Sequence, residues 1–151
     1  MSERGDKAKA LFESGYNCAQ ATLIAFTDIT GLSEETSAMI ASGFGGGMGR
    51  MREVCGAVSG MMLVLNMKFG NTSITDKDAK DGHYALVQKY IRMFQEETGS
   101  IVCRELLGLP GKQSDPPVSE ARTNAYYKKR PCAEMVALAA QITETALKEN
   151  L

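Results

Sequence analysis

Cys55-Gly-Ala-Val-Ser-Gly-Met-Met-Leu-Val-Leu-Asn-Met67 is the longest nearly apolar stretch of this 151-residue chain. We expect it to lie in a helix that runs from about Arg52 to Lys68 and ends near Gly70. A membrane-spanning helix needs about 20 apolar residues, and this stretch is shorter. It is interrupted by glycine or polar residues at Gly56, Ser59, Gly60 and Asn66. The stretch therefore predicts no membrane insertion.

A glycine-rich segment, Gly43-Phe-Gly-Gly-Gly-Met-Gly49, comes shortly before this helix. Glycine adopts backbone angles that other residues avoid and lets other groups approach closely. The segment fits neither the P-loop pattern nor the dinucleotide-binding pattern of glycines, so nucleotide binding is not favoured. Two interpretations stay open. The loop lets the chain pass tightly beside Cys55, or its amides hold a small anion together with Arg50 and Arg52.

The rest of the chain consists mostly of segments with helical signals, whereas the period-two alternation of strands is absent. Caps and glycine stops predict helices over residues 2–14, 18–28, from 33 onward, 76–98, 103–107 and 131–148. We therefore expect an all-α, single-domain helical bundle of five to seven helices over residues 1–151. An irregular Gly/Pro-rich connection is expected at residues 108–131, as a lid, as a partner-binding loop, or with a short helix at about 119–127.

Composition narrows the class of protein. Seventeen Lys and Arg balance eighteen Asp and Glu, giving a formal net charge of −1. A dedicated nucleic-acid binder usually has a strong basic excess, so no nucleic-acid partner is expected. The first seven residues contain no apolar segment typical of a secretory signal, which favours a cytoplasmic location. Four cysteines in a reducing compartment are not expected to form static structural disulfides.

The four cysteines share one feature, because each lies at or near a predicted helix start. Cys18 follows the cap Asn17, Cys132 follows Pro131, and Cys55 and Cys103 fall in first turns. A helix N-terminus has free amide donors and a partial positive charge, which favour thiolate over thiol. Thiolate is both the nucleophile and the metal-ligating form. No C-x-x-C pair occurs, so zinc-ribbon and thioredoxin-type signatures are absent.

Helical periodicity places three of these cysteines, Cys18, Cys55 and Cys132, on the core side of their helices, where they could meet. Cys132 shares a face with Ala139 and Ile142, and Cys55 shares one with Val58 and Met62. The alternative is that all four are inert buried thiols, because free cysteine often acts as a small hydrophobic residue.

Cys55-Gly56-Ala57-Val58-Ser59-Gly60 is a C-G-A-x-x-G string, with one cysteine upstream and two downstream. In this ordered set the chain resembles the C_GCAxxG_C_C family of redox proteins, from Cys18 to Cys132. The resemblance implies a redox role for Cys18, Cys55, Cys103 and Cys132, but it implies neither a substrate nor a reaction. Gly56 and Gly60 are one turn apart, so another backbone could approach there and bring its cysteine near Cys55.

Other candidate residues are less informative. His83, the only histidine, lies on the apolar face of the longest predicted helix. It is expected as a core histidine bonded to a backbone carbonyl, although a ligand or proton-shuttle role stays open. Tyr126-Tyr-Lys-Lys-Arg130 is expected to be a solvated segment.

Our leading hypothesis is a thiol-dependent oxidoreductase that exchanges disulfides or transfers electrons with a redox partner protein or a small thiol or disulfide. Cys55 is expected to be the low-pKa nucleophile, stabilised by Arg50, Arg52 or Arg104. A second hypothesis is that the four cysteines hold zinc or an iron–sulfur cluster. A third is a helical interaction protein with inert cysteines, acting as a homo-oligomer. Four cysteines allow three disulfide pairings, and the sequence does not select one.

Overall fold

Helix α6 (Gly56–Phe69) lies at the centre of the computed structural model, which describes residues 2–111 and 113–151. All residues of the C-G-A-x-x-G string that follow its cysteine, from Gly56 to Gly60, are buried. Small residues there leave room for helices on several sides, and α2, α7 and α10 all pack against α6. Eight of the 14 residues of α6 are buried, so most of this apolar helix belongs to the core.

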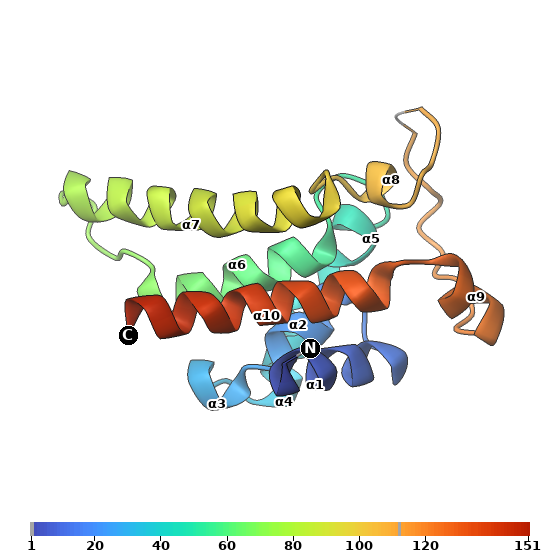
Figure 1. Cartoon of the computed structure of the whole chain (residues 1–151), viewed down its shortest axis with the longest axis horizontal. Helices are drawn as coiled ribbons and strands as arrows, with labels where there is room; N and C mark the ends of the chain where they lie inside the picture. Colours follow the sequence, from blue (N-terminus) through green and yellow to red (C-terminus); the bar gives the residue numbers. More distant parts are fainter. Residues whose placement is uncertain (1, 112) are drawn as a thin grey trace.

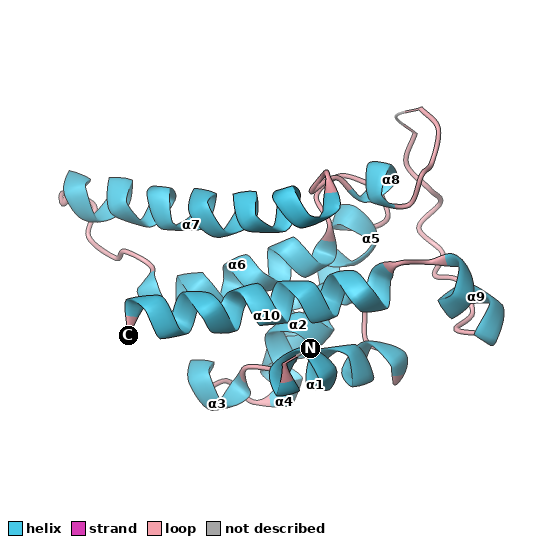
Figure 2. Ribbon diagram, in the orientation of Figure 1, coloured by secondary structure: helices cyan, strands magenta, loops and turns pink. Residues whose placement is uncertain are grey.

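The described residues form helices and loops, with a single isolated β-bridge in place of any strand (Figure 2). The all-α class is therefore confirmed. The helices are α1 (Glu3–Glu13), α2 (Cys18–Ile24), α3 (Thr27–Thr30), α4 (Glu34–Ala41), α5 (Gly45–Met48), α6 (Gly56–Phe69), α7 (Lys77–Thr98), α8 (Cys103–Leu106), α9 (Asn124–Lys129) and α10 (Cys132–Asn150), with a 3₁₀ turn at Ser42–Phe44.

The number of helical segments exceeds the expected five to seven, for local reasons. The helix predicted over 18–28 is divided into α2 and α3 at Phe26, whose backbone leaves the helical region. The glycine-rich segment adds the short α5. Helix α6 begins at Gly56 and not near Arg52, because residues 53–55 pair with residues 101–103.

Several predicted helix starts are confirmed by their capping bonds. The side chains of Ser2, Asn17 and Ser33 accept hydrogen bonds from the first turns of α1, α2 and α4. The N-cap residue of α7 is Asp76 and not the preceding Thr75. Gly31 and Gly99 end helices with positive φ, as expected of C-terminal glycines.

The helices are arranged in layers. In Figure 1, the long α7 runs alongside α6 and α10, while α1, α2 and α4 cover the opposite side of that pair. The core between them is formed by large apolar side chains from all layers, among them Phe12, Phe26, Met61, Tyr90 and Phe94.

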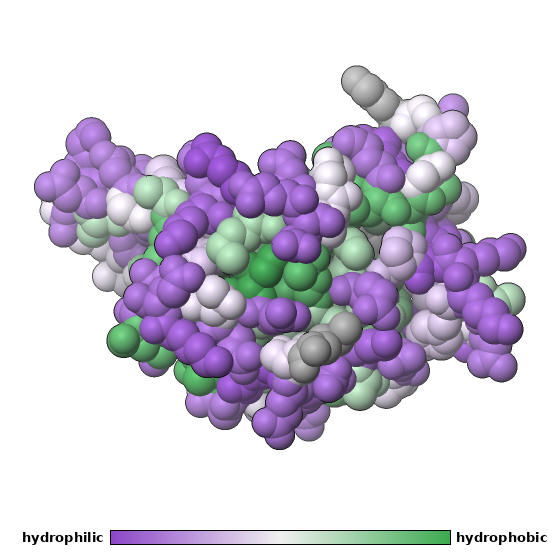
Figure 3. Space-filling view, viewed as in Figure 1, coloured by the Kyte–Doolittle hydropathy of each residue, from purple (hydrophilic) through white to green (hydrophobic). Residues whose placement is uncertain are grey.

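Helix α7 is covered incompletely. Of its 22 residues, only Tyr90 and Phe94 are fully buried. Figure 3 shows hydrophobic side chains gathered between α7 and α10 on the face in view, within a mostly hydrophilic surface. No helix among the described residues combines the length and apolarity needed to cross a lipid bilayer.

The connection predicted to be irregular at 108–131 contains one helix, α9, a few residues later than the expected 119–127. Lys112 lies outside the described residues. The part from 113 to 123, here named the lid segment, has no helix and is mostly exposed. It passes over the end of the molecule where α5 and α8 lie (Figure 1).

Candidate functional site

All four cysteines occupy helix starts in the structure. Cys18, Cys103 and Cys132 are the first residues of α2, α8 and α10, and Cys55 is the N-cap residue of α6. Local signals explain two of these starts. Asn17 and Gln20 form a capping box at the start of α2, and Pro131 directly precedes Cys132. The prediction from the sequence is confirmed for each cysteine.

Glycines of the motif bring Cys18 to the site. A Cβ atom at Gly56 would lie 3.1 Å from the Cβ atom of Cys18, and one at Gly60 would lie 2.7 Å from that of Thr22. The backbones of α2 and α6 therefore approach to a distance that only glycine permits. The close approach expected from Gly56 and Gly60 is confirmed, and α2 is the helix that uses it.

A short antiparallel pairing brings Cys55 and Cys103 together. The Cys55 amide donates to the carbonyl of Ile101 at 2.7 Å, and the Cys103 amide donates to that of Glu53 at 2.6 Å. Val54 and Val102 form the isolated bridge between these bonds. Residues far apart in the sequence thus present two thiols from adjacent backbone segments.

One cavity of about 420 Å³ is lined by Cys18, Cys55, Cys103 and Cys132 together. Cys18 and Cys132 are partly exposed, whereas Cys55 and Cys103 are buried, and no cysteine is in a disulfide. Cys18, Cys55 and Cys132, which we expected on the core side of their helices, therefore line one cavity, and Cys103 lines it too. The two partly exposed cysteine residues are those that begin α2 and α10.

The thiols of Cys18 and Cys132 act on each other's ionisation, and their pKa values move apart. The Cys18 thiol, as a hydrogen-bond donor, and the guanidinium groups of Arg130, Arg52 and Arg122 together lower the pKa of Cys132 to about 7, although burial acts in the opposite direction. The role of donor raises the pKa of Cys18 well above its usual value, and burial adds to the shift. Cys132 is therefore the more acidic thiol of the pair.

Cys55 does not have the low pKa that we expected of it. Burial raises its pKa to about 12, although the amides of Ala57 and Val58 act in the opposite direction. The helix N-terminus does favour the thiolate, but desolvation by the surrounding core is the larger effect. Burial also raises the pKa of Cys103, partly offset by a hydrogen bond from Arg52.

The glycine-rich segment forms an unusual turn that places two arginines. Residues 46–50 all have positive φ, including Met48 at 68° and Arg50 at 68°, and Arg52 follows at 61°. L residues rarely adopt such angles, so the turn holds Arg50 and Arg52 in strained conformations. Gly47 lies against Cys103, since a Cβ at Gly47 would be 2.6 Å from the Cβ of Cys103. The tight passage that we predicted beside Cys55 is therefore beside Cys103.

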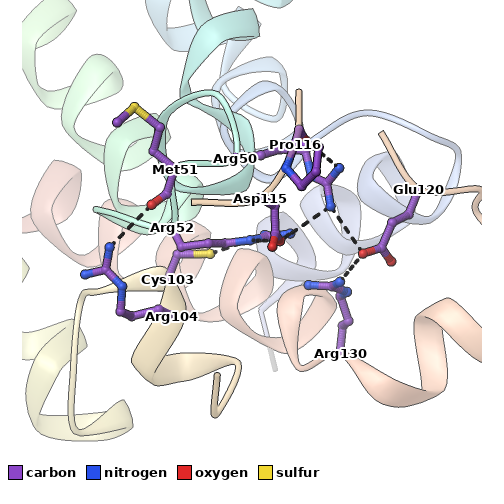
Figure 4. A network of polar contacts seen from close by, with 9 residues as sticks. All are labelled: Arg50, Met51, Arg52, Cys103, Arg104, Asp115, Pro116, Glu120 and Arg130. Atoms are coloured by element: carbon purple, nitrogen blue, oxygen red, sulfur yellow. Dashed lines mark hydrogen bonds and ion pairs between the residues drawn. The ribbon is translucent and has the colours of Figure 1, made fainter. Parts of the chain in front are cut away.

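Arg52 links the cysteines to the lid segment. Its side chain is almost fully buried, its Nη1 lies 3.6 Å from the Sγ of Cys103, and its Nε donates to Asp115 at 2.7 Å. Figure 4 shows this link together with the contacts of Arg50 to Asp115, Pro116 and Glu120. Glu120 also pairs with Arg130. The lid segment is held to the cavity wall by its two carboxylates.

Two arginines of the site were not identified from the sequence. Arg122 and Arg130 line the cavity, as does Tyr126, although we expected the segment from Tyr126 to Arg130 to be solvated. Arg122 donates to the carbonyls of Phe12 and Tyr16, so its place depends on contacts with α1 and the residues after it. The position of Arg130 two residues before Cys132 was the one available signal. Of the arginines named earlier, Arg104 does not line the cavity and pairs with Glu53.

No group of three or more His, Cys, Asp or Glu side chains within residues 2–111 and 113–151 is arranged to hold a metal ion. His83 is away from the cysteines. Its Nε2 lies 2.7 Å from the Oδ1 of Asn66, so its partner is a side chain and not the expected backbone carbonyl.

Residues 16–146 match the family model described as "Putative redox-active protein (C_GCAxxG_C_C)". The chain belongs to this family. The match includes all four cysteines and both lining arginines of the C-terminal region, so the C_GCAxxG_C_C pattern and the cavity coincide. No curated protein and no solved structure matches the chain.

Proposed function

We propose that this member of the C_GCAxxG_C_C family is a thiol–disulfide oxidoreductase whose reactive dithiol is Cys18 and Cys132. The observation that carries the proposal is that these two cysteines line one cavity and shift each other's pKa in opposite directions. They are also the two partly exposed cysteines. A nucleophile and a resolving thiol in contact are what disulfide exchange requires.

Cys132 is the nucleophile in this mechanism. Its pKa of about 7 keeps a large fraction as thiolate near neutral pH. The Cys132 thiolate attacks one sulfur of a substrate disulfide, forms a mixed disulfide with it, and releases the other half as a thiolate. A thiol with a pKa near the ambient pH is the most effective attacking group.

Cys18 resolves the mixed disulfide. It loses its proton, attacks the sulfur of Cys132, and releases the second half of the substrate as a thiolate. The protein dithiol is thereby oxidised by two electrons to a Cys18–Cys132 disulfide, and the substrate disulfide is reduced to two thiols. A thiol or dithiol donor then reduces the protein again by the reverse exchange.

Cys55 and Cys103 take no part in this first step in our proposal. Burial favours their protonated form, and a thiol is a poor nucleophile. They line the same cavity as the first pair.

The test is to oxidise the reduced protein with one equivalent of bis(hydroxyethyl) disulfide and to map the bond by mass spectrometry after acid quenching. We expect loss of two thiols and a Cys18–Cys132 bond. Cys132→Ser should abolish the reaction, and Cys18→Ser should stop it at a mixed disulfide on Cys132. Cys103→Ala is the control and should still form the bond.

Two outcomes would contradict the proposal. One is that all four thiols stay reduced or that the bond maps to another pair. The other is that protein purified without oxygen contains stoichiometric zinc, or an absorbing iron–sulfur cluster, bound through the four cysteines.

A further inference from the structure

Guanidinium groups are concentrated at the cavity. Four of the seven arginines of the chain line it, namely Arg50, Arg52, Arg122 and Arg130, and no lysine among the described residues does. Glu120 is the one acidic side chain among the described lining residues. Because the whole chain has a formal net charge of −1, this positive charge is a local feature of the site.

These arginines are positioned by the fold. Arg50 and Arg52 project from the strained turn after the glycines, and their side chains are 18% and 6% exposed. Arg122 stacks over the ring of Phe12, with its Cζ 4.5 Å from the ring centre. Side chains held in this way lose little further conformational freedom when they bind a ligand.

The carboxylates of the lid segment show which chemistry fits these guanidinium groups. Asp115 and Glu120 are bound by Arg50, Arg52 and Arg130. Both carboxylates belong to an exposed segment with no helix. The planar fork of arginine binds the oxygens of carboxylate and phosphate groups in pairs, whereas lysine acts as a point charge. An anionic ligand can therefore replace Glu120 on Arg50 and Arg130.

The size of the cavity indicates a small molecule. Its volume of about 420 Å³ falls in the range of sites for small ligands, about 300–1,000 Å³. Glycines, the aromatic residues Phe12 and Tyr126, and the cysteines Cys18 and Cys132 line the same space. A molecule bound by the arginines would lie beside the dithiol.

We infer that the substrate is a small disulfide with anionic groups, which Arg50, Arg122 and Arg130 bind next to Cys132. This inference rests on the proposed function, since it assigns the substrate class of the same dithiol. The arginines attract the anionic groups of the substrate. The Cys132 thiolate then attacks one sulfur of its disulfide, and Cys18 resolves the mixed disulfide. Two thiols bearing the anionic groups are the products.

The experiment compares three small disulfides of similar length but different charge. Dithiodipropionate is a dianion, bis(hydroxyethyl) disulfide is neutral and cystamine is a dication. For each disulfide, the rate of thiol release by the reduced protein is divided by the rate at which a simple alkyl thiol reduces the same disulfide. This normalisation removes differences in the intrinsic reactivity of the three disulfides. We expect the normalised rate for the dianion to exceed that for the dication at least about tenfold at low salt. Added salt should reduce this ratio.

Variants assign the preference to the cavity. Arg50→Gln and Arg130→Gln should each lower the ratio of dianion to dication. Because Arg130 also lowers the pKa of Cys132, each variant's rates are divided by its own rate for the neutral disulfide, which removes a change in the thiolate fraction. Arg92→Gln removes a positive charge from the exposed face of α7, where Arg92 contacts Gln88, and should leave the ratio unchanged. Circular dichroism shows whether each variant is folded, and the salt series on the unaltered protein needs no variant.

The outcomes separate the two proposals. If the neutral disulfide is reduced but the normalised rates show no preference for the dianion, the inference about the substrate is wrong and the dithiol function stands. An equal loss of preference in Arg92→Gln would also contradict it. If none of the three disulfides is reduced, the proposed function itself is wrong.

Discussion

The interaction between Cys18 and Cys132 separates the pKa values of thiols that hold the same position in their helices. All four cysteines share the favourable position at a helix start, yet their pKa values shift in different directions. The partial charge of a helix end is a modest effect, whereas a bonded neighbour and the degree of burial are larger. At the scale of single residues, therefore, the Cys18–Cys132 contact is the feature to test.

The first prediction concerns the pH dependence of Cys132. Alkylation by iodoacetamide, followed at Cys132 by mass spectrometry, should rise with pH and reach half its maximum near pH 7, because only the thiolate reacts. Cys18→Ala removes the donated hydrogen bond, so the pKa of Cys132 should rise and the curve should move to higher pH. Cys18→Ser keeps a donor and should move it less. A curve that is unchanged in Cys18→Ala would refute this account.

At the scale of elements, the approach of α2 to α6 sets the distance between Cys18 and the rest of the site. Ala19 and Thr22 of α2 lie directly over Gly60, with the Ala19 carbonyl oxygen 2.8 Å from where a Cβ would be. A methyl group has no space there. The two helices would have to separate, and the separation would be transmitted to Cys18.

The second prediction compares two glycines. Gly60→Ala should lower the free energy of unfolding by about 1–3 kcal/mol, because it overpacks a helix contact. Gly82→Ala, in an exposed part of α7 with no atom near the new Cβ, should raise it by about 0.5–1 kcal/mol through better helix propensity. Urea unfolding followed by circular dichroism measures both. Equal effects of the two substitutions would mean that the α2–α6 contact is not tight.

The third prediction concerns the lid segment. Glu120 is 44% exposed, so its ion pairs with Arg50 and Arg130 contribute no more than about 1 kcal/mol to stability. Glu120→Gln should therefore leave the unfolding free energy nearly unchanged. It should still speed proteolysis within residues 113–123 and raise the rate with dithiodipropionate a few-fold, because Arg50 and Arg130 each lose one ion pair. Glu96→Gln, on the exposed side of α7, is the control. Slower reaction in Glu120→Gln would show that Glu120 helps to bind the substrate.

At the scale of the whole molecule, the proposed disulfide joins distant parts of the chain. Cys18 begins α2 near the N-terminus, and Cys132 begins α10, the last helix. A bond between them would close a loop that contains most of the sequence. Such a loop restricts the unfolded chain far more than the folded one.

The fourth prediction follows from that loop. Oxidised protein should unfold at a higher guanidinium concentration than reduced protein, corresponding to about 2–4 kcal/mol. Cys132→Ala cannot form the bond, so its unfolding should not depend on the redox state. Oxidised protein that is less stable than reduced protein would indicate a strained bond and would argue against rapid cycling.

The sequence alone determined the local structure of this protein. Asn17, Ser33 and Pro131 marked helix starts because capping involves only neighbouring residues. The same locality explains why every cysteine was placed correctly at a helix start. The boundary that failed, at the beginning of α6, lies where residues 52–55 pair with a segment some fifty residues away, which no local signal records.

Only the tertiary structure decided which of the four thiols has a lowered pKa and what surrounds it. Cys55 follows the same local rule as Cys132, but the core that packs around α6 buries it and raises its pKa. Arg122 and Arg130 join Arg50 and Arg52 through contacts between segments that are distant in sequence. Desolvation and charge pairing depend on the complete set of spatial neighbours, and these exist only once the chain has folded.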